Sequence, residues 1–144
     1  MRADYRAINP DAIRGLASVG KHLDAIDTSL RALLELRVSQ INGCAYCVDK
    51  HANESREAGE SQQRLDCLPV WEESELFSDD ECAALAWAEV LTGLADRYDT
   101  AEAYENLTKY FSEEEIVAIT LVVATMNAWN RIGVGFDLKP IYRE

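Results

Sequence analysis

The same local pattern opens two segments of the chain: a phenylalanine, then a serine, then a glutamate three residues after the serine. It occurs at Ser78 and Glu81 and again at Ser112 and Glu115. In such a capping box the serine oxygen accepts a hydrogen bond from the third backbone N–H, and the glutamate accepts one from the serine N–H. These bonds satisfy donors that a helix start leaves free. The chain is therefore predicted to begin helices at positions 79 and 113.

The segment after the second capping box is the most apolar in the chain. Residues 116–123 are rich in β-branched side chains, which are common in strands. We assign a helix instead, from residue 113 to about residue 131. The capping box precedes the segment, and its apolar pattern continues far beyond strand length. A helix that is apolar nearly all round is typically the central helix of a fold.

The composition agrees with a fold made of helices alone. The 144 residues include only 7 Gly and 3 Pro, which leaves little turn material for a many-stranded fold. Residues that favour helix are plentiful. No linker, low-complexity segment or block of charge divides the chain, so we expect one domain over residues 1–144. The predicted fold class is all-α, a bundle of about six to seven helices.

Cap signals place the other predicted helices. Asn9 can cap a helix that starts at Pro10, since proline suits the first helical position. Asn42 and Gly43 tolerate the left-handed conformation that ends a helix, so Cys44 is expected at the N-terminus of the next one, which runs to about residue 58. The remaining predicted helices are residues 28–42, a short helix after Ser61, 79 to about 95, and 100–110.

The charge of the chain argues against two classes of partner. The net charge is −12 and the pI about 4.5, and an acidic surface repels nucleic acid and anionic lipid. No signal peptide is visible, and the longest apolar run, residues 116–126, is shorter than the roughly 20 residues that cross a bilayer. A cytoplasmic protein with no membrane partner is expected. Thiols there stay mostly reduced, so a Cys-x-x-Cys pair is more often catalytic or metal-binding than a structural staple.

One stretch carries groups suited to thiol redox chemistry. Cys44, Cys47 and His51 fall on one face of the predicted helix, and Cys47 and His51 are an i,i+4 pair that can touch. A thiolate is the reactive form of cysteine. A helix N-terminus at Cys44 and an imidazole near Cys47 would both favour it.

Two other interpretations of the motif stay open. The cysteines could be small buried hydrophobic residues. Alternatively, Cys44, Cys47 and His51 could supply three zinc ligands, with the fourth taken from the remaining soft ligands: Cys67, Cys82 and His22. None of these forms a second paired motif, and we expect the two cysteines to be inert core residues and the histidine to be solvated. No metal or cofactor is predicted.

Residues 36–51 closely resemble the core of the AhpD-like alkylhydroperoxidases, which belong to the carboxymuconolactone decarboxylase superfamily. Residues 58–65, 77–89 and 127–131 resemble later segments of the same proteins, so the likeness covers about residues 30–136. The resemblance implies an AhpD-like helical bundle that assembles as a homotrimer or homohexamer. It also implies peroxidase or disulfide reductase activity without metal or haem.

The resemblance assigns roles to the motif. Cys47 would attack the hydroperoxide and become a sulfenic acid. Cys44 would then form the disulfide, and an external dithiol, such as a lipoyl-type protein, would reduce it. His51 would take part in the proton relay.

The sequence departs from the family pattern at one position. The relay glutamate of the family usually lies twelve residues before the first cysteine, and Ala32 stands there. Glu35, one turn later, either replaces it or is a solvated surface carboxylate. We therefore consider three functions: a thiol peroxidase or disulfide reductase, a non-enzymatic redox-responsive oligomer, and a structural zinc protein.

Overall fold

The fold is entirely helical in the part of the chain that the structure, a computed structural model, describes: residues 1–96 and 99–143. Arg97, Tyr98 and Glu144, which fall within the predicted domain, lie outside the described residues. The α-helices are α1 (Tyr5–Ile8), α2 (Pro10–Ser18), α3 (Thr28–Asn42), α4 (Ala45–Glu57), α5 (Gln62–Cys67), α6 (Trp71–Ser74), α7 (Asp79–Thr92), α8 (Ala101–Leu107) and α9 (Glu113–Gly135). Short 3-10 helices span Val19–His22, Leu68–Val70 and Leu94–Asp96.

The all-α prediction is confirmed, and the seven predicted helices correspond to α2 to α5 and α7 to α9. The one-turn helices α1 and α6 were not predicted, because four residues carry little periodicity. Several ends also differ. The helix α9 continues four residues beyond the predicted end at residue 131, to Gly135, whereas α7 gives way to a 3-10 turn after Thr92.

The capping boxes define the starts of α7 and α9. Ser112 Oγ accepts from Glu115 N–H (3.3 Å), and Glu115 Oε2 accepts from Ser112 N–H (2.7 Å). At the start of α7, Ser78 N–H donates to Glu81 Oε2 (2.9 Å). Both helices therefore begin where the sequence predicted.

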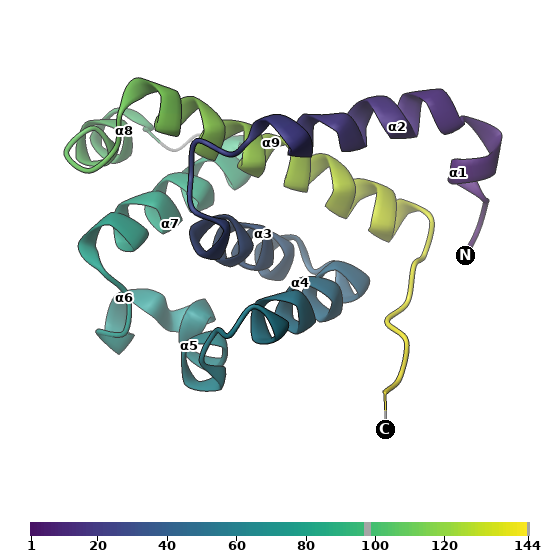
Figure 1. Ribbon diagram of the computed structural model, residues 1–144, viewed down its shortest axis with the longest axis horizontal. Helices are drawn as coiled ribbons and strands as arrows, with labels where there is room; N and C mark the ends of the chain where they lie inside the picture. The colour runs from purple at the N-terminus through teal and green to yellow at the C-terminus, as the bar shows by residue number, and fades with distance from the viewer. Residues whose placement is uncertain (97–98, 144) are drawn as a thin grey trace.

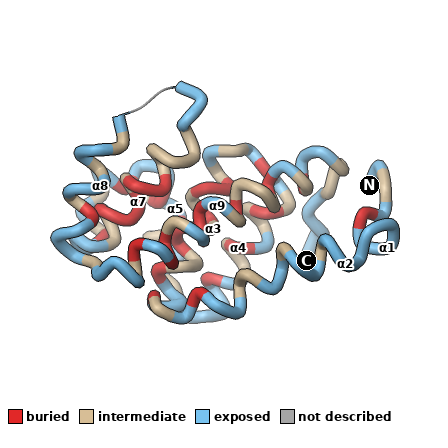
Figure 2. The backbone as a smooth tube through the Cα atoms, turned by 90° about the horizontal axis from the view of Figure 1, so that it is seen from above, coloured by how far each residue is buried: buried red, intermediate tan, exposed pale blue. Residues whose placement is uncertain are grey.

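The helix α9 is the centre of the bundle and packs against α3, α7 and α4 (Figure 1). Figure 2 shows that the buried positions gather on α3, α7 and α9, whereas α2 has no buried residue. The largest fully buried side chains include Leu33, Leu34, Leu36, Leu85, Ile119 and Val122. The α3–α4–α9 contact positions the cysteine motif at the edge of this core.

The length and apolar character of α9 also meet the requirement for a membrane span. Its most apolar 18-residue stretch has a mean hydropathy of 1.3, and 44% of that stretch is buried inside the fold. The core helix of a soluble protein has the same properties, and the contacts with α3 and α7 give α9 that role here.

Candidate functional site

A sharp turn between α3 and α4 places the cysteine pair. Gly43 ends α3 with φ 67°, a left-handed conformation that costs glycine little. Its N–H points to the carbonyls of Ser39 and Gln40, and Cys44 N–H donates to Ser39 as well (3.2 Å). Cys44 is thus the N-cap of α4, in agreement with the sequence prediction.

Cys44 and Cys47 are joined in a disulfide across the first turn of α4. Cys44 Sγ also accepts a hydrogen bond from Cys47 N–H at 3.3 Å. The side chains are buried, with 1% and 4% of their surfaces exposed. The pair is therefore held in its oxidised form at a helix N-terminus, where free N–H groups would favour a thiolate after reduction.

The helix α9 approaches the disulfide at Gly133. A Cβ atom at this position would lie 2.8 Å from Cys44 Sγ and 3.2 Å from Cys47 Sγ. Real Cβ atoms essentially never lie as close as 2.8 Å to another heavy atom. Any residue other than glycine at position 133 would therefore force the sulfur atoms or α9 to move. The sequence alone did not indicate this role, because Gly133 lies 86 residues beyond Cys47.

His51 lies one helical turn after Cys47 and faces two carboxylates. Its Nδ1 atom is 3.3 Å from Glu35 Oε2 and 3.1 Å from Glu54 Oε2. Glu35 is the more enclosed acid, with 17% of its side chain exposed against 49% for Glu54. Arg31 Nε donates to the other oxygen of Glu35 (2.8 Å), which fixes the carboxylate toward the imidazole.

Burial lowers the pKa of His51, and the nearby charge of Glu35 opposes this shift. Only 8% of the His51 surface is exposed, so the positive form loses much of its hydration. This direction favours the neutral imidazole at pH 7. A neutral ring that carries its proton on Nδ1, the atom beside the carboxylates, would leave Nε2 free to accept a proton.

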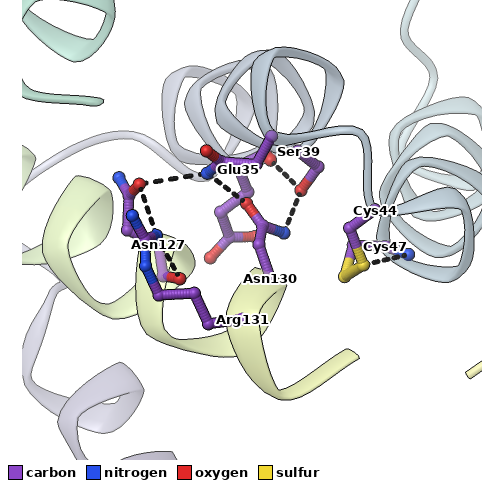
Figure 3. Close-up of a disulfide and its surroundings, with 8 residues drawn as sticks. Glu35, Ser39, Cys44, Cys47, Asn127, Asn130 and Arg131 are labelled. Atoms are coloured by element: carbon purple, nitrogen blue, oxygen red, sulfur yellow. Dashed lines mark hydrogen bonds between the residues drawn. A yellow bond between two sulfur atoms is a disulfide. The ribbon is translucent and has the colours of Figure 1, made fainter. Parts of the chain in front are cut away.

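Two asparagines of α9 hold the end of α3 that leads into the cysteine turn (Figure 3). Asn42 Nδ2 donates to the side-chain oxygens of Asn127 and Asn130, both at 3.0 Å. Asn130, which is buried, donates in turn to Ser39 Oγ (3.0 Å). The i,i+3 spacing of the α9 pair was visible in the sequence, but its partners on α3 were not.

A cavity of about 630 Å³ opens beside the pair. Its lining includes Cys47, His51 and Glu35, whereas Cys44 lies outside it. Ala32, at the position of the expected glutamate, lines the same cavity. The four candidate residues from the sequence are thus brought together, and of the two cysteines it is Cys47 that lines the cavity.

The other soft ligands do not join this cluster. His22 is exposed, as expected. Cys67 and Cys82 were predicted to be core residues but are only half-buried, although Cys82 still packs against the core. Burial, with the charge of Asp79, raises the pKa of the Cys82 thiol. Within residues 1–96 and 99–143, no group of three or more His, Cys, Asp or Glu side chains could hold a metal ion.

Comparisons with known proteins show which family the sequence matches. The model of the carboxymuconolactone decarboxylase family matches residues 10–90. The uncharacterized protein YdfG of Bacillus subtilis is 34% identical over 135 residues, 92% of each chain. YnjA of Escherichia coli, also uncharacterized, is 27% identical over 78% of this chain and 62% of its own length.

Solved structures share the fold. The Agrobacterium tumefaciens protein ATU0492 has unknown function and is described as a candidate antioxidant defence protein AhpD. It matches with a TM-score of 0.93 and 36% identity, over 99% of both chains. The debrominase Bmp8 matches with a TM-score of 0.83 and 24% identity, over 94% of this chain and 74% of its own.

Proposed function

Since the chain belongs to the carboxymuconolactone decarboxylase family, we propose that it is a thiol-dependent peroxidase of the AhpD-like type that reduces organic hydroperoxides. The observation that carries the proposal is the position of the Cys44–Cys47 disulfide. It lies at a helix N-terminus, with Cys47 at the wall of a cavity and the buried His51 one turn away.

The first step is attack by Cys47. His51 accepts the thiol proton, and the Cys47 thiolate attacks the outer oxygen of the hydroperoxide. A sulfur–oxygen bond forms and the oxygen–oxygen bond breaks. Cys47 becomes a sulfenic acid, and the alkoxide takes a proton, which His51 can return, to leave as an alcohol.

The second step forms the disulfide. The sulfur of Cys44 attacks the sulfur of the sulfenic acid, which releases water and gives the pair seen in the structure. The substrate has then gained two electrons and the protein has lost two. An external dithiol, for which a lipoyl-type group is the proposed class, reduces the pair by exchange and becomes a disulfide itself.

The assignment of the two sulfurs rests on access. Cys47 lines the cavity and Cys44 does not, so a hydroperoxide in the cavity meets Cys47 first. Cys44, at the N-cap position, accepts a hydrogen bond from Cys47 N–H. Cys44 is therefore held within one helical turn of Cys47, whose sulfur it must attack. Glu35 acts as a positioning residue, because it faces His51 rather than the cavity sulfur.

The test is turnover of cumene hydroperoxide with a panel of reductants that includes dihydrolipoamide and a small monothiol. Cys47→Ser should abolish turnover. Cys44→Ser should consume one equivalent of peroxide and accumulate a sulfenic acid that dimedone traps. Cys82→Ser, at a half-buried thiol outside the cavity, serves as the control and should keep wild-type turnover.

Two outcomes would contradict the proposal. If Cys47→Ser kept wild-type turnover, Cys47 would not be the residue that attacks the hydroperoxide and the proposed mechanism would be wrong. Stoichiometric oxidation of the wild-type pair, without turnover under any reductant, would instead support a redox-responsive protein that is not an enzyme.

We also propose that the chain forms a homotrimer or homohexamer. The apolar helix α9 leaves Val117, Leu121 and Val134 exposed, and exposed apolar patches commonly mark interfaces. Light scattering on the full chain at micromolar concentration measures the assembly directly, and a monomeric mass would contradict this expectation.

A further inference from the structure

The cavity beside Cys47 is much larger than hydrogen peroxide requires. Its volume of about 630 Å³ lies in the range of pockets for small organic ligands. Apolar side chains from three parts of the chain form much of its wall: Ile13, Ala17, Met126, Trp129, Ile132 and Leu138. Aromatic rings of Tyr5 and Tyr46 join them. The lining therefore suits a substrate with an apolar, preferably aromatic, body.

Three cationic side chains line the same cavity, and two of them already have anionic partners. Arg31 pairs with Glu35, and Lys50 pairs with Glu54 at 2.6 Å. Among residues 1–96 and 99–143, no carboxylate lies within ion-pair distance of Arg6. In a chain of net charge −12, an unpaired guanidinium on the wall of a cavity is an unused site for an anion.

Arg6 is held at the cavity by α1. The ring of Tyr5 is buried and stacks on Phe136 with ring centroids 5.2 Å apart. Arg2 N–H donates to Phe136 O (2.8 Å), which ties the start of the chain to the end of α9. The Arg6 guanidinium lies over the Tyr5 ring, 5.5 Å from its centroid. The Tyr5–Phe136 stacking and the Arg2–Phe136 hydrogen bond thus hold α1, and with it Arg6, beside the cavity.

The surroundings of Arg6 favour its charge. The neighbouring phenol group of Tyr5 raises the pKa of Arg6 most strongly, burial opposes this shift, and Tyr46 adds a smaller increase. Asp4 lies in an adjoining hollow that shares Arg6, but its side chain caps α1 by accepting from Ala7 N–H. The acids inside the main cavity, Glu35 and Glu54, belong to the His51 cluster. An anionic substrate group would be repelled there and attracted to Arg6.

We propose that the cavity selects an organic hydroperoxide that carries a carboxylate, with the carboxylate bound by Arg6 and the hydroperoxide directed to Cys47. The inference deepens the proposed peroxidase function and rests on it. The overall negative charge of the protein disfavours anions everywhere except at a local cation. A preference for a carboxylate-bearing hydroperoxide over a neutral one would therefore indicate such a local cation. Arg6 is a specificity residue and takes no part in the bond changes.

The test compares two hydroperoxides with the same aromatic body. These are 4-(2-hydroperoxypropan-2-yl)benzoate and its neutral methyl ester. For wild type, kcat/KM should be higher for the carboxylate by about three- to tenfold, the range of one partly exposed charged hydrogen bond. Arg6→Gln should bring the ratio close to one, and Arg6→Lys should restore part of it. The control Arg14→Gln, at an exposed arginine of α2 outside the cavity, should keep the wild-type ratio.

Binding of the product separates this inference from the peroxidase proposal. The alcohol 4-(2-hydroxypropan-2-yl)benzoate should bind the oxidised wild-type protein by calorimetry and bind Arg6→Gln about three- to tenfold more weakly. A ratio near one in wild type, or equal product binding by both proteins, would overturn the role of Arg6. Product binding that depends on Arg6 without turnover of either hydroperoxide would overturn the peroxidase proposal and retain the anion site.

Discussion

The Nδ1 atom of His51 lies 3.3 Å from Oε2 of Glu35. Glu35 follows Ala32 by one turn of α3. Ala32 and Glu35 line the same cavity, so a carboxylate one turn further along the helix reaches the imidazole that follows the cysteine pair. The bond from Arg31 fixes this carboxylate. A carboxylate therefore lies beside the imidazole although Ala32 stands where the resemblance led us to expect the glutamate.

Glu35→Gln tests whether this carboxylate supports the imidazole. Burial lowers the pKa of His51, and the charge of Glu35 raises it. Removal of that charge should therefore lower this pKa further. We expect kcat/KM for the peroxide to fall about tenfold or more, as for other residues that orient an active group. The acidic limb of the pH–rate profile should move to lower pH. Stopped-flow rates across pH 5–8 measure both effects.

Glu54→Gln is the matched control for this experiment. Glu54 also lies near His51, but half of its side chain is exposed, and its charge raises the pKa of His51 less than the charge of Glu35 does. Its profile should move less. If Glu35→Gln and wild type gave superimposable profiles, Glu35 would have no part in the relay. Ala32→Glu in the Glu35→Gln background should restore part of the rate.

The sequence predicted the features that depend on local rules. The capping boxes at Ser78 and Ser112 and the turn at Gly43 require only a few neighbouring residues, and all three are observed. The position of Cys44 at the start of α4 followed from the same turn. Helix ends without a strong signal were less predictable, since a helix such as α9 frays or continues according to its tertiary contacts.

The missing parts of the site depend on contacts between distant segments. Gly133 matters because α9 crosses the disulfide, and Asn130 matters because α3 ends beside it. Arg6 reaches the cavity only because Tyr5 docks on Phe136. None of these pairings leaves a periodic signal in one sequence, so they became visible only in the fold.

Gly133→Ala should weaken the disulfide selectively. The added Cβ would lie 2.8 Å from Cys44 Sγ in the oxidised protein, and overpacking of this kind costs about 1–3 kcal/mol. Reduced thiols can rotate apart, so the reduced form should lose less. We expect the variant to be reduced at a lower ratio of dithiol to disulfide in the buffer, as measured by thiol alkylation at equilibrium. Gly135→Ala, where a Cβ meets nothing within 4 Å, should equilibrate like wild type.

Asn130→Ala should destabilise the whole fold. The side chain accepts from Asn42 and donates to Ser39 Oγ, and its removal deletes both bonds, although Asn42 keeps Asn127 and Ser39 keeps the Glu35 carbonyl as partners. A hydrogen bond contributes about 0.5–1.5 kcal/mol net, so the free energy of unfolding should fall by about 1–3 kcal/mol in urea titration. Asn53→Ala removes an amide that bonds only to Glu57 within α4 and should cost under about 1 kcal/mol. Equal losses in both variants would mean that the α3–α9 network adds nothing.

His51 should make the folded state less stable in mild acid. Its pKa is lowered from 6.5 by burial, so the unfolded chain binds this proton at a higher pH than the folded chain does. The free energy of unfolding should therefore rise with pH in the window below 6.5, where the unfolded chain carries more bound protons. Above that window both states are neutral at this residue and the effect ends.

The wild-type protein should thus lose stability relative to His51→Gln as the pH falls from 7 to 5. The other histidine, His22, is present in both proteins and cancels in the difference. Urea titrations at half-unit pH steps measure the free energy of unfolding of both proteins. If wild type keeps or gains stability relative to His51→Gln as the pH falls toward 5, the imidazole is not held neutral by burial.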